Sequence, residues 1–232
     1  MTMGEILGKV MVGRAHLAQV GLPTVRNLVF MGMGEPLMNL TELLRSLETL
    51  GSAEGISIAS RRSTVSSVGI PAALKILGDS GLAVPAISLH APTQELRERL
   101  MPKAARVPLP ELMASLDAYP IRPRERVTYE YIMLGGVNDS IAHAKQLVRL
   151  LGQRRCKVNL IGYNPPPPQA GVTPPYRAPE QADVLAFEDY LRSKRITTFL
   201  RRSMGQDIAA ACGQLKLLAG ETVGDNRDGD GD

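Results

Sequence analysis

The sequence contains little cysteine and no long apolar run, and each shortage excludes a class of protein. Two cysteines among 232 residues, Cys156 and Cys212, are too few for a disulfide framework and favour a reducing, cytoplasmic compartment. They are also too few for an iron–sulfur cluster, which usually takes about three or four thiolates. Apolar runs such as 28–34 and 81–89 fall far short of the roughly 20 residues that span a bilayer. The first twenty residues contain no apolar block of the kind found in a secretory signal, so neither secretion nor membrane insertion is expected.

The charge is distributed unevenly along the chain. The net charge is +4, but residues 221–232 contribute −4 and leave a body of +8. A positive surface attracts phosphate backbones, but short charge runs on helix ends are often only solvated faces. Nucleic-acid binding and a merely solvated surface therefore both stay open. The acidic, Gly-Asp-rich segment 221–232 is expected to be a disordered tail after a domain over 1–220. The basic residues gather at Arg61-Arg62, Arg97/Arg99/Lys103/Arg106, Arg122/Arg124/Arg126, Arg154-Arg155-Lys157, Arg192/Lys194/Arg195 and Arg201-Arg202.

Helical and strand patterns alternate along the chain, which predicts an α/β fold. Alternation of this kind indicates a parallel sheet with helical crossovers, either open or closed into a barrel. Because the series begins with a helix, a first strand is missing and a sheet edge or barrel gap is exposed; either another chain covers it or the domain is incomplete. The expected helices are about 4–20, 39–51, 71–78, 95–100, 109–118, 140–151 and 180–194, and the expected strands 25–30, 56–66, 84–89, 127–134, 156–163 and 196–202.

Polar residues follow several of the predicted strands, and the carboxyl ends of parallel strands are where such folds bind ligands. A carboxylate there can accept hydrogen bonds from an ammonium group, and hydroxyl or amide groups can hold a carboxylate or a ribose. Each of these residues could equally be an ordinary turn or cap residue, and His90 a structural histidine. The candidates are Gly34 and Glu35, Ser66 with Ser67, Ser88-Leu89-His90, and Asn164.

The two cysteines differ in their surroundings. Cys156 shares a strand face with Val158 and Leu160, which predicts core packing. Cys212 lies in the small-residue segment 209–214, where a ligand could reach the sulfur, although a buried thiol is the plainer interpretation.

Six segments occur in a fixed order along the chain: Gly32-Met33-Gly34-Glu35-Pro36-Leu37, Ile87-Ser88-Leu89-His90-Ala91-Pro92, Thr128-Tyr129-Glu130-Tyr131, Gly136-Val137-Asn138-Asp139-Ser140, Lys157-Val158-Asn159-Leu160-Ile161, and Asp207-Ile208 with Ala210-Ala211-Cys212-Gly213-Gln214-Leu215. Together they resemble one family over residues 1 to about 220, the RlmN-type radical S-adenosylmethionine methyltransferases. These enzymes make 2-methyladenosine in large-subunit ribosomal RNA and in tRNA. The resemblance implies a six-stranded partial (β/α) barrel, a monomer, and the use of S-adenosylmethionine, a 4Fe-4S cluster and a reducing electron donor.

The resemblance also implies roles for individual residues. Gly34, Glu35, Ser66, Ser88, Leu89, His90 and Asn164 match S-adenosylmethionine contacts, and Cys212 matches the cysteine that carries the methyl group. Carbon 2 of adenine has no lone pair to attack a sulfonium, and therefore the thiolate takes the methyl group first, by displacement.

The chain departs from the family in one block. The cluster motif C-x-x-x-C-x-x-C is absent, as are the first strand, the N-terminal RNA-binding domain, the catalytic glutamate and the resolving cysteine. The resemblance therefore implies an N-terminally truncated enzyme, and we expect no methylation by this chain alone. Two alternatives stay open: a cluster-free remnant that binds S-adenosylmethionine or RNA, and an unrelated barrel enzyme that uses Glu35 and His90 as an acid–base pair.

Overall fold

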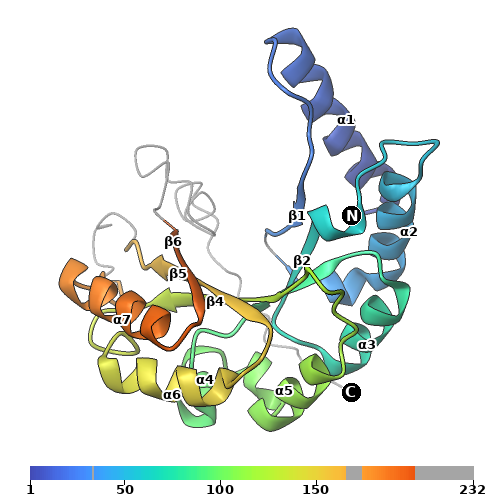
Figure 1. Ribbon diagram of the computed structural model, residues 1–232. Helices are drawn as coiled ribbons and strands as arrows, with labels where there is room; N and C mark the ends of the chain where they lie inside the picture. The colour runs from blue at the N-terminus through green and yellow to red at the C-terminus, as the bar shows by residue number, and fades with distance from the viewer. Residues whose placement is uncertain (33, 166–173, 202–232) are drawn as a thin grey trace, which may run out of the picture.

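The described residues, 1–32, 34–165 and 174–201, form a six-stranded parallel sheet in this computed structural model (Figure 1). The strand order is β1-β2-β3-β4-β5-β6, so each strand pairs with the next along the chain through a helical crossover. Within the described residues β1 and β6 do not pair, which makes the sheet an open, partial barrel, as the family resemblance implies. The strands are β1 (Leu28–Phe30), β2 (Ser63–Ser67), β3 (Val84–Ser88), β4 (Val127–Met133), β5 (Cys156–Gly162) and β6 (Thr197–Arg201).

The helices α2 to α7 lie along the outer, convex side of this curved sheet (Figure 1). The helices are α1 (Met3–Gln19), α2 (Leu40–Gly51), α3 (Pro71–Ser80), α4 (Gln94–Leu100), α5 (Leu109–Asp117), α6 (Ile141–Leu151) and α7 (Gln181–Ser193), with short 3₁₀ turns at Pro36–Asn39, Ser60–Arg62 and Ala104–Arg106. None of the helices in the described ranges combines the length and the apolar character that a bilayer crossing needs.

Side chains alternate between the two faces of each strand, and the helix-covered face forms the core. On β4, Tyr129, Tyr131 and Met133 are buried, and the Tyr131 ring lies 5.4 Å from the ring of Phe187 in α7. Cys156 is buried in the same core, as predicted. The intervening residues of β4, such as Glu130, therefore occupy the concave face.

Most predicted elements are present, with shifted ends. Ser140 caps α6 by accepting from the backbone of His143, and Thr2 and Glu5 form a capping box at α1. The third helix does not end at Gly78 as predicted, because it continues to Ser80 and ends at Gly81, whose φ of 63° suits glycine. The first two strands are also shorter than predicted.

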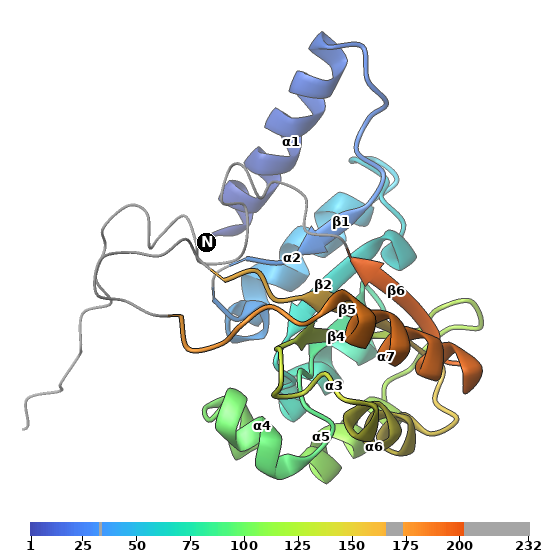
Figure 2. The same cartoon turned by 90° about the vertical axis from the view of Figure 1, so that its left-hand side faces the viewer.

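Helix α1 projects away from the rest of the molecule (Figure 2). None of its seventeen residues is buried. Near its start it is held to α2 and the 3₁₀ turn before it, where the Met3 amide donates to Glu42 at 2.6 Å and Asn39 Nδ2 donates to the Met1 carbonyl at 2.7 Å. A cavity of about 570 Å³ lies between α1 and β1, and Gly34 and Glu35 belong to its lining.

Candidate functional site

The turn after β1 holds Glu35 by two backbone amides from different parts of the chain. Glu35 Oε1 accepts the Leu37 amide at 3.0 Å, and Oε2 accepts the Val68 amide at 2.9 Å, just beyond β2. Gly34 precedes it with φ of 100°, which disfavours a side chain, and nothing lies within 4 Å of a Cβ built there. The carboxylate is thus fixed while each oxygen retains a lone pair for a further donor.

Val68 connects this carboxylate to a buried arginine. While its amide donates to Glu35, its carbonyl accepts from Arg97 Nη2 at 2.7 Å. Arg97 is fully buried, so it adds no charge to a positive surface formed by the basic cluster Arg97/Arg99/Lys103/Arg106. Its Nε and Nη1 have no hydrogen-bond partner among the described residues, and burial lowers the pKa of the guanidinium.

The His90 side chain is hydrogen-bonded to the backbone of β4. Its Nδ1 accepts the Ile132 amide at 3.1 Å, and its backbone adopts φ of 53°. Burial, and then the charge of Arg97, lowers the pKa of His90 to about 4, so the imidazole is neutral at pH 7 with its proton on Nε2. An Nδ1 that already accepts a hydrogen bond cannot also take up a proton, which counts against an acid–base pair of Glu35 and His90.

The buried side chain of Asn138 links the ends of β3 and β4. Its Nδ2 donates to the carbonyls of His90, at 2.9 Å, and Ile132, at 2.7 Å. Its Oδ1 accepts the Leu134 amide at 2.6 Å. Backbone groups therefore use both hydrogens of Nδ2 and the oxygen Oδ1. Because one of these groups is the His90 carbonyl, Asn138 fixes the backbone position of His90.

Sheet register places the serines relative to the other polar residues of the concave face. Ser66 is paired with Ala86, while Ser88 is paired with Glu130, and Glu130 in turn with Asn159. Ser88, Glu130 and Asn159 therefore form one transverse row across β3, β4 and β5, which we call the polar row. Leu89 is fully buried in the core and contributes its amide, which donates to the Glu130 carbonyl at 3.1 Å.

Sequence reasoning did not single out Glu130. Asn159 Nδ2 donates to its Oε1 at 2.9 Å, while its Oε2 is buried with no hydrogen-bond partner among the described residues. Burial raises the pKa of this carboxyl, against the Asn159 hydrogen bond and the charges of Arg201 and Lys157. The signal was present in Thr128-Tyr129-Glu130-Tyr131, where alternation places the carboxylate opposite the two buried rings.

Three further residues from the sequence analysis are Asn164 and the two cysteines. Asn164 follows β5 and is half-buried. Cys212 lies outside the described residues, as does the tail 221–232. Cys156 faces the helix-covered core, and burial raises the pKa of its thiol to about 11, so it is placed to pack rather than to react.

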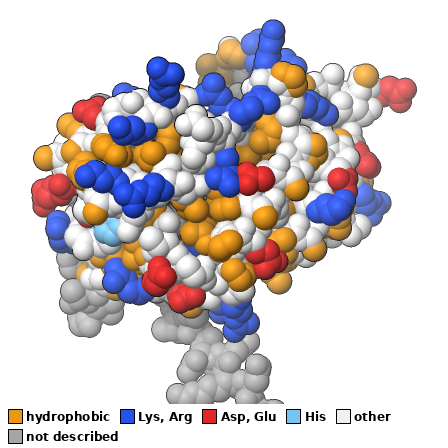
Figure 3. Space-filling view, turned by 60° about the horizontal axis from the view of Figure 1, so that its bottom comes forward, with side chains coloured by type: hydrophobic (Ala, Val, Ile, Leu, Met, Phe, Trp, Pro, Cys, Tyr) orange, Lys and Arg blue, Asp and Glu red, His pale blue; other side chains and the backbone are white. Residues whose placement is uncertain are grey.

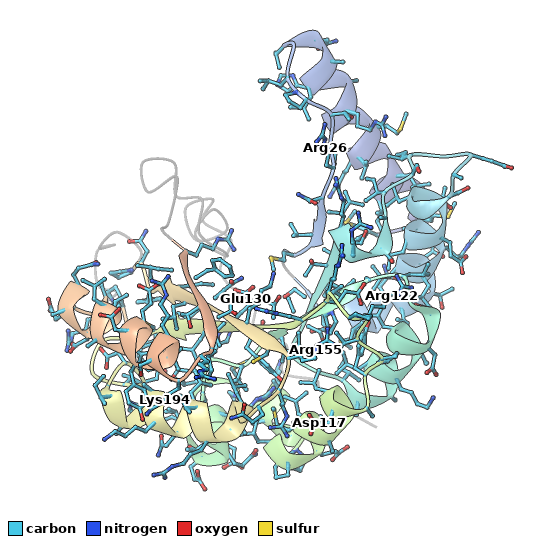
Figure 4. The ribbon with its side chains drawn as sticks, viewed as in Figure 1. Arg26, Asp117, Arg122, Glu130, Arg155 and Lys194 are labelled. Atoms are coloured by element: carbon cyan, nitrogen blue, oxygen red, sulfur yellow. The ribbon has the colours of Figure 1, made fainter. Side chains whose placement is uncertain are left out.

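Several of the basic residues lie where strands begin, opposite the candidate site. Arg155 and Arg122 are labelled in Figure 4, and Arg155 Nη2 donates to the Arg122 carbonyl at 2.8 Å. Arg126 Nη1 donates to Thr197 at 2.5 Å. Arg154 forms a bidentate salt bridge with Asp117, with N–O distances of 2.6 and 2.7 Å, and this interaction lowers the pKa of the Asp117 carboxyl. The face in Figure 3 shows basic side chains scattered among apolar and acidic ones, without one continuous basic patch.

The sheet is parallel and partly closed, and its candidate ligand-binding residues lie at the carboxyl ends of the strands, an arrangement that the radical S-adenosylmethionine barrels share. A solved radical SAM methyltransferase from Sphaerobacter thermophilus superposes with a TM-score of 0.84 at 39% identity, over 92% of this chain and 61% of that one. A domain of a pyruvate-formate lyase-activating enzyme from Bacteroides vulgatus shares the fold alone, with a TM-score of 0.54 at 14% identity.

The sequence comparison gives the particular family. A protein named dual-specificity RNA methyltransferase RlmN from Nitratidesulfovibrio vulgaris strain Miyazaki F is 58% identical over 230 residues, and one from Oleidesulfovibrio alaskensis is 57% identical over 226. The predicted resemblance to the RlmN-type radical S-adenosylmethionine methyltransferases is thereby confirmed. The match covers 96% of this chain but 61% of the first relative, so the chain spans about three fifths of the length of these proteins. No family model matches the chain.

Proposed function

We propose that this chain supplies the S-adenosylmethionine-binding barrel of an RNA methyltransferase that modifies carbon 2 of adenosine in ribosomal RNA and tRNA. The observation that carries the proposal is the Glu35 carboxylate, which two backbone amides fix at the carboxyl end of the sheet. The names of the homologues support the reaction, and the body charge of +8 suits an RNA substrate. We further propose that it acts in the cytoplasm as a monomer, with a reducing electron donor as partner.

The residues of the site fit an amino-acid-bearing nucleoside. Glu35 retains lone pairs for the ammonium group, and Gly34 lets the main chain approach because it has no side chain. We assign Ser66, Ser88 and Asn164 to the carboxylate and ribose groups, with Leu89 and His90 shaping the end of β3. The neutral imidazole of His90 presents an Nε2–H donor rather than a cation.

We assign the methyl-accepting role to Cys212. Its thiolate would form a bond to the methyl carbon as the bond from that carbon to the sulfonium breaks, which releases S-adenosylhomocysteine as the neutral leaving group. The family's 4Fe-4S cluster has no matching ligand set in the described ranges, where no group of three or more His, Cys, Asp or Glu side chains could hold a metal ion. We therefore assign to these residues only cofactor binding and the methyl-accepting thiol.

Calorimetry with S-adenosylmethionine tests the proposal. We expect the chain to bind it, and Glu35→Gln to weaken binding by at least tenfold because the charged acceptor for the ammonium is lost. Glu42→Gln is the matched control, since Glu42 contacts Arg45 and the Met3 amide rather than the strand ends. Absence of binding by the wild-type chain would refute the proposal.

A second candidate, a binding module without turnover, is favoured by the cysteine count of two. It shares the calorimetric expectation and adds affinity for ribosomal RNA, measured by filter binding. Detection of 2-methyladenosine in RNA after incubation with the chain and S-adenosylmethionine would contradict it.

A further inference from the structure

One buried group has no function in the site described so far. Glu130 is 5% exposed, and its Oε2 lacks a hydrogen-bond partner among the described residues. A buried carboxylate oxygen without a partner costs free energy, and a native structure normally satisfies such an atom with water or a ligand. Figure 4 shows Glu130 on the concave side of the sheet, the side on which helices α2 to α7 do not pack.

The other oxygen of the same carboxylate is already engaged. Asn159 Nδ2 donates to Oε1 at 2.9 Å across neighbouring strands, which fixes the plane of the carboxylate. The Glu130 backbone is held as well, because its carbonyl accepts from the amides of Leu89 and His90, at 3.1 and 3.3 Å. Glu130 is thus a preorganised acceptor, and its buried Oε2 still lacks a donor among the described residues.

The neighbours of this oxygen indicate what kind of donor is missing. The polar row places a serine hydroxyl on one side of Glu130 and a carboxamide on the other, with adjacent strands roughly 4.8 Å apart. The next residue along the row, Phe199 of β6, is 53% exposed, so the row opens to solvent on that side. A row of hydroxyl, carboxylate and carboxamide groups offers both acceptors and donors to a ligand that carries several hydroxyl groups.

Cationic side chains of this face do not satisfy the oxygen. Arg201 and Lys157 act on Glu130 through their charge, yet neither forms an ion pair with it in the structure. Ser88, which the family resemblance assigns to cofactor binding, is the register partner of Glu130. The missing donor is therefore expected on the same ligand that Ser88 contacts.

We propose that Glu130 binds the ribose hydroxyls of S-adenosylmethionine through Oε2, with Asn159 positioning the carboxylate. The inference rests on the proposed function, since it concerns the nucleoside part of the same ligand. It assigns specificity for a ribose with both hydroxyl groups to a residue in the middle of β4. Glu35 and Glu130 then recognise groups on the two sides of the sulfonium, the methionyl ammonium and the ribose.

The test compares S-adenosylmethionine with its 2′-deoxy and 3′-deoxy analogues by calorimetry on the full 232-residue chain. For the wild-type chain we expect at least one analogue to bind about tenfold or more weakly, since a site built to accept a hydroxyl loses a charged hydrogen bond when that hydroxyl is removed. Glu130→Gln should weaken binding of S-adenosylmethionine by a similar factor and should discriminate little between the parent and that analogue. The matched control is Glu188→Gln, because Glu188 is also buried but lies on α7 beside Arg192.

The outcomes separate this inference from the function on which it rests. If the wild-type chain binds S-adenosylmethionine and both analogues equally well, the proposed function stands and the role of Glu130 is refuted. The same holds if Glu130→Gln retains the full wild-type discrimination. If the wild-type chain binds none of the three, both proposals fail together. The wild-type comparison needs no variant, so it decides the matter even if Glu130→Gln does not fold.

Discussion

Removal of the Asn138 side chain should destabilise the fold strongly, because this carboxamide satisfies three backbone groups at once. In Asn138→Ala the carbonyls of His90 and Ile132 and the amide of Leu134 lose their partner. Each unsatisfied buried group costs about 1–3 kcal/mol, and partial access of water reduces the sum to roughly 3–6 kcal/mol. That is a large fraction of the roughly 5–15 kcal/mol by which a domain is stable.

Urea unfolding measures this effect. With a slope of about 2 kcal/mol per molar urea, the midpoint of Asn138→Ala should fall by roughly 1.5–3 M. The control is Asn39→Ala, in which an exposed hydrogen bond to the Met1 carbonyl is lost and the change should stay within about 0.5 kcal/mol. If Asn138→Ala unfolds within about 1 kcal/mol of the wild type, the inferred bridging role of Asn138 is wrong.

Three further predictions concern single residues. The pKa of His90 is about 4 in the folded chain against an ordinary 6.5, so the unfolded chain takes up a proton first and stability falls as the pH drops from about 6.5 to 4. Thermal unfolding should show that His90→Gln loses about 2–3 kcal/mol less stability than the wild type over that range. An equal loss of stability in the two proteins would contradict this. Gly69→Ala should cost roughly 2–4 kcal/mol in urea unfolding, because φ is 93° and the new Cβ would overlap Leu112, whereas Gly8→Ala on open α1 should cost nothing. Cys156 should resist alkylation at pH 8 until urea is added, since it is buried with its pKa raised to about 11; rapid native labelling of Cys156 in a peptide map would refute its placement.

The architecture could be predicted because it depends on local patterns. Strands rich in β-branched residues alternate with helical segments, and right-handed crossovers leave few other arrangements. The same reasoning brings Glu35, Ser66 and Ser88 to one end of the sheet, because parallel strands point in the same direction. The predicted end of a helix is less accurate where two glycines could each terminate it, as Gly78 and Gly81 could at the end of α3.

The contacts between strand ends could not be predicted, because they depend on register and on packing between distant segments. Arg97 belongs to a charged stretch, 94–99, that is typical of an exposed helix, yet its side chain is buried and donates to the Val68 carbonyl, 29 positions away. The pairing of Glu130 with Asn159 joins residues 29 positions apart, and only the β4–β5 register makes them neighbours.

The most direct test is a crystal structure of the chain with bound S-adenosylmethionine. It should show the ammonium on Glu35, the ribose beside Ser88, and the Cys212 sulfur facing the cofactor's methyl group. A ligand bound elsewhere, or a Cys212 sulfur separated from residues 35, 66, 88 and 164 by other side chains, would contradict the proposed cofactor site.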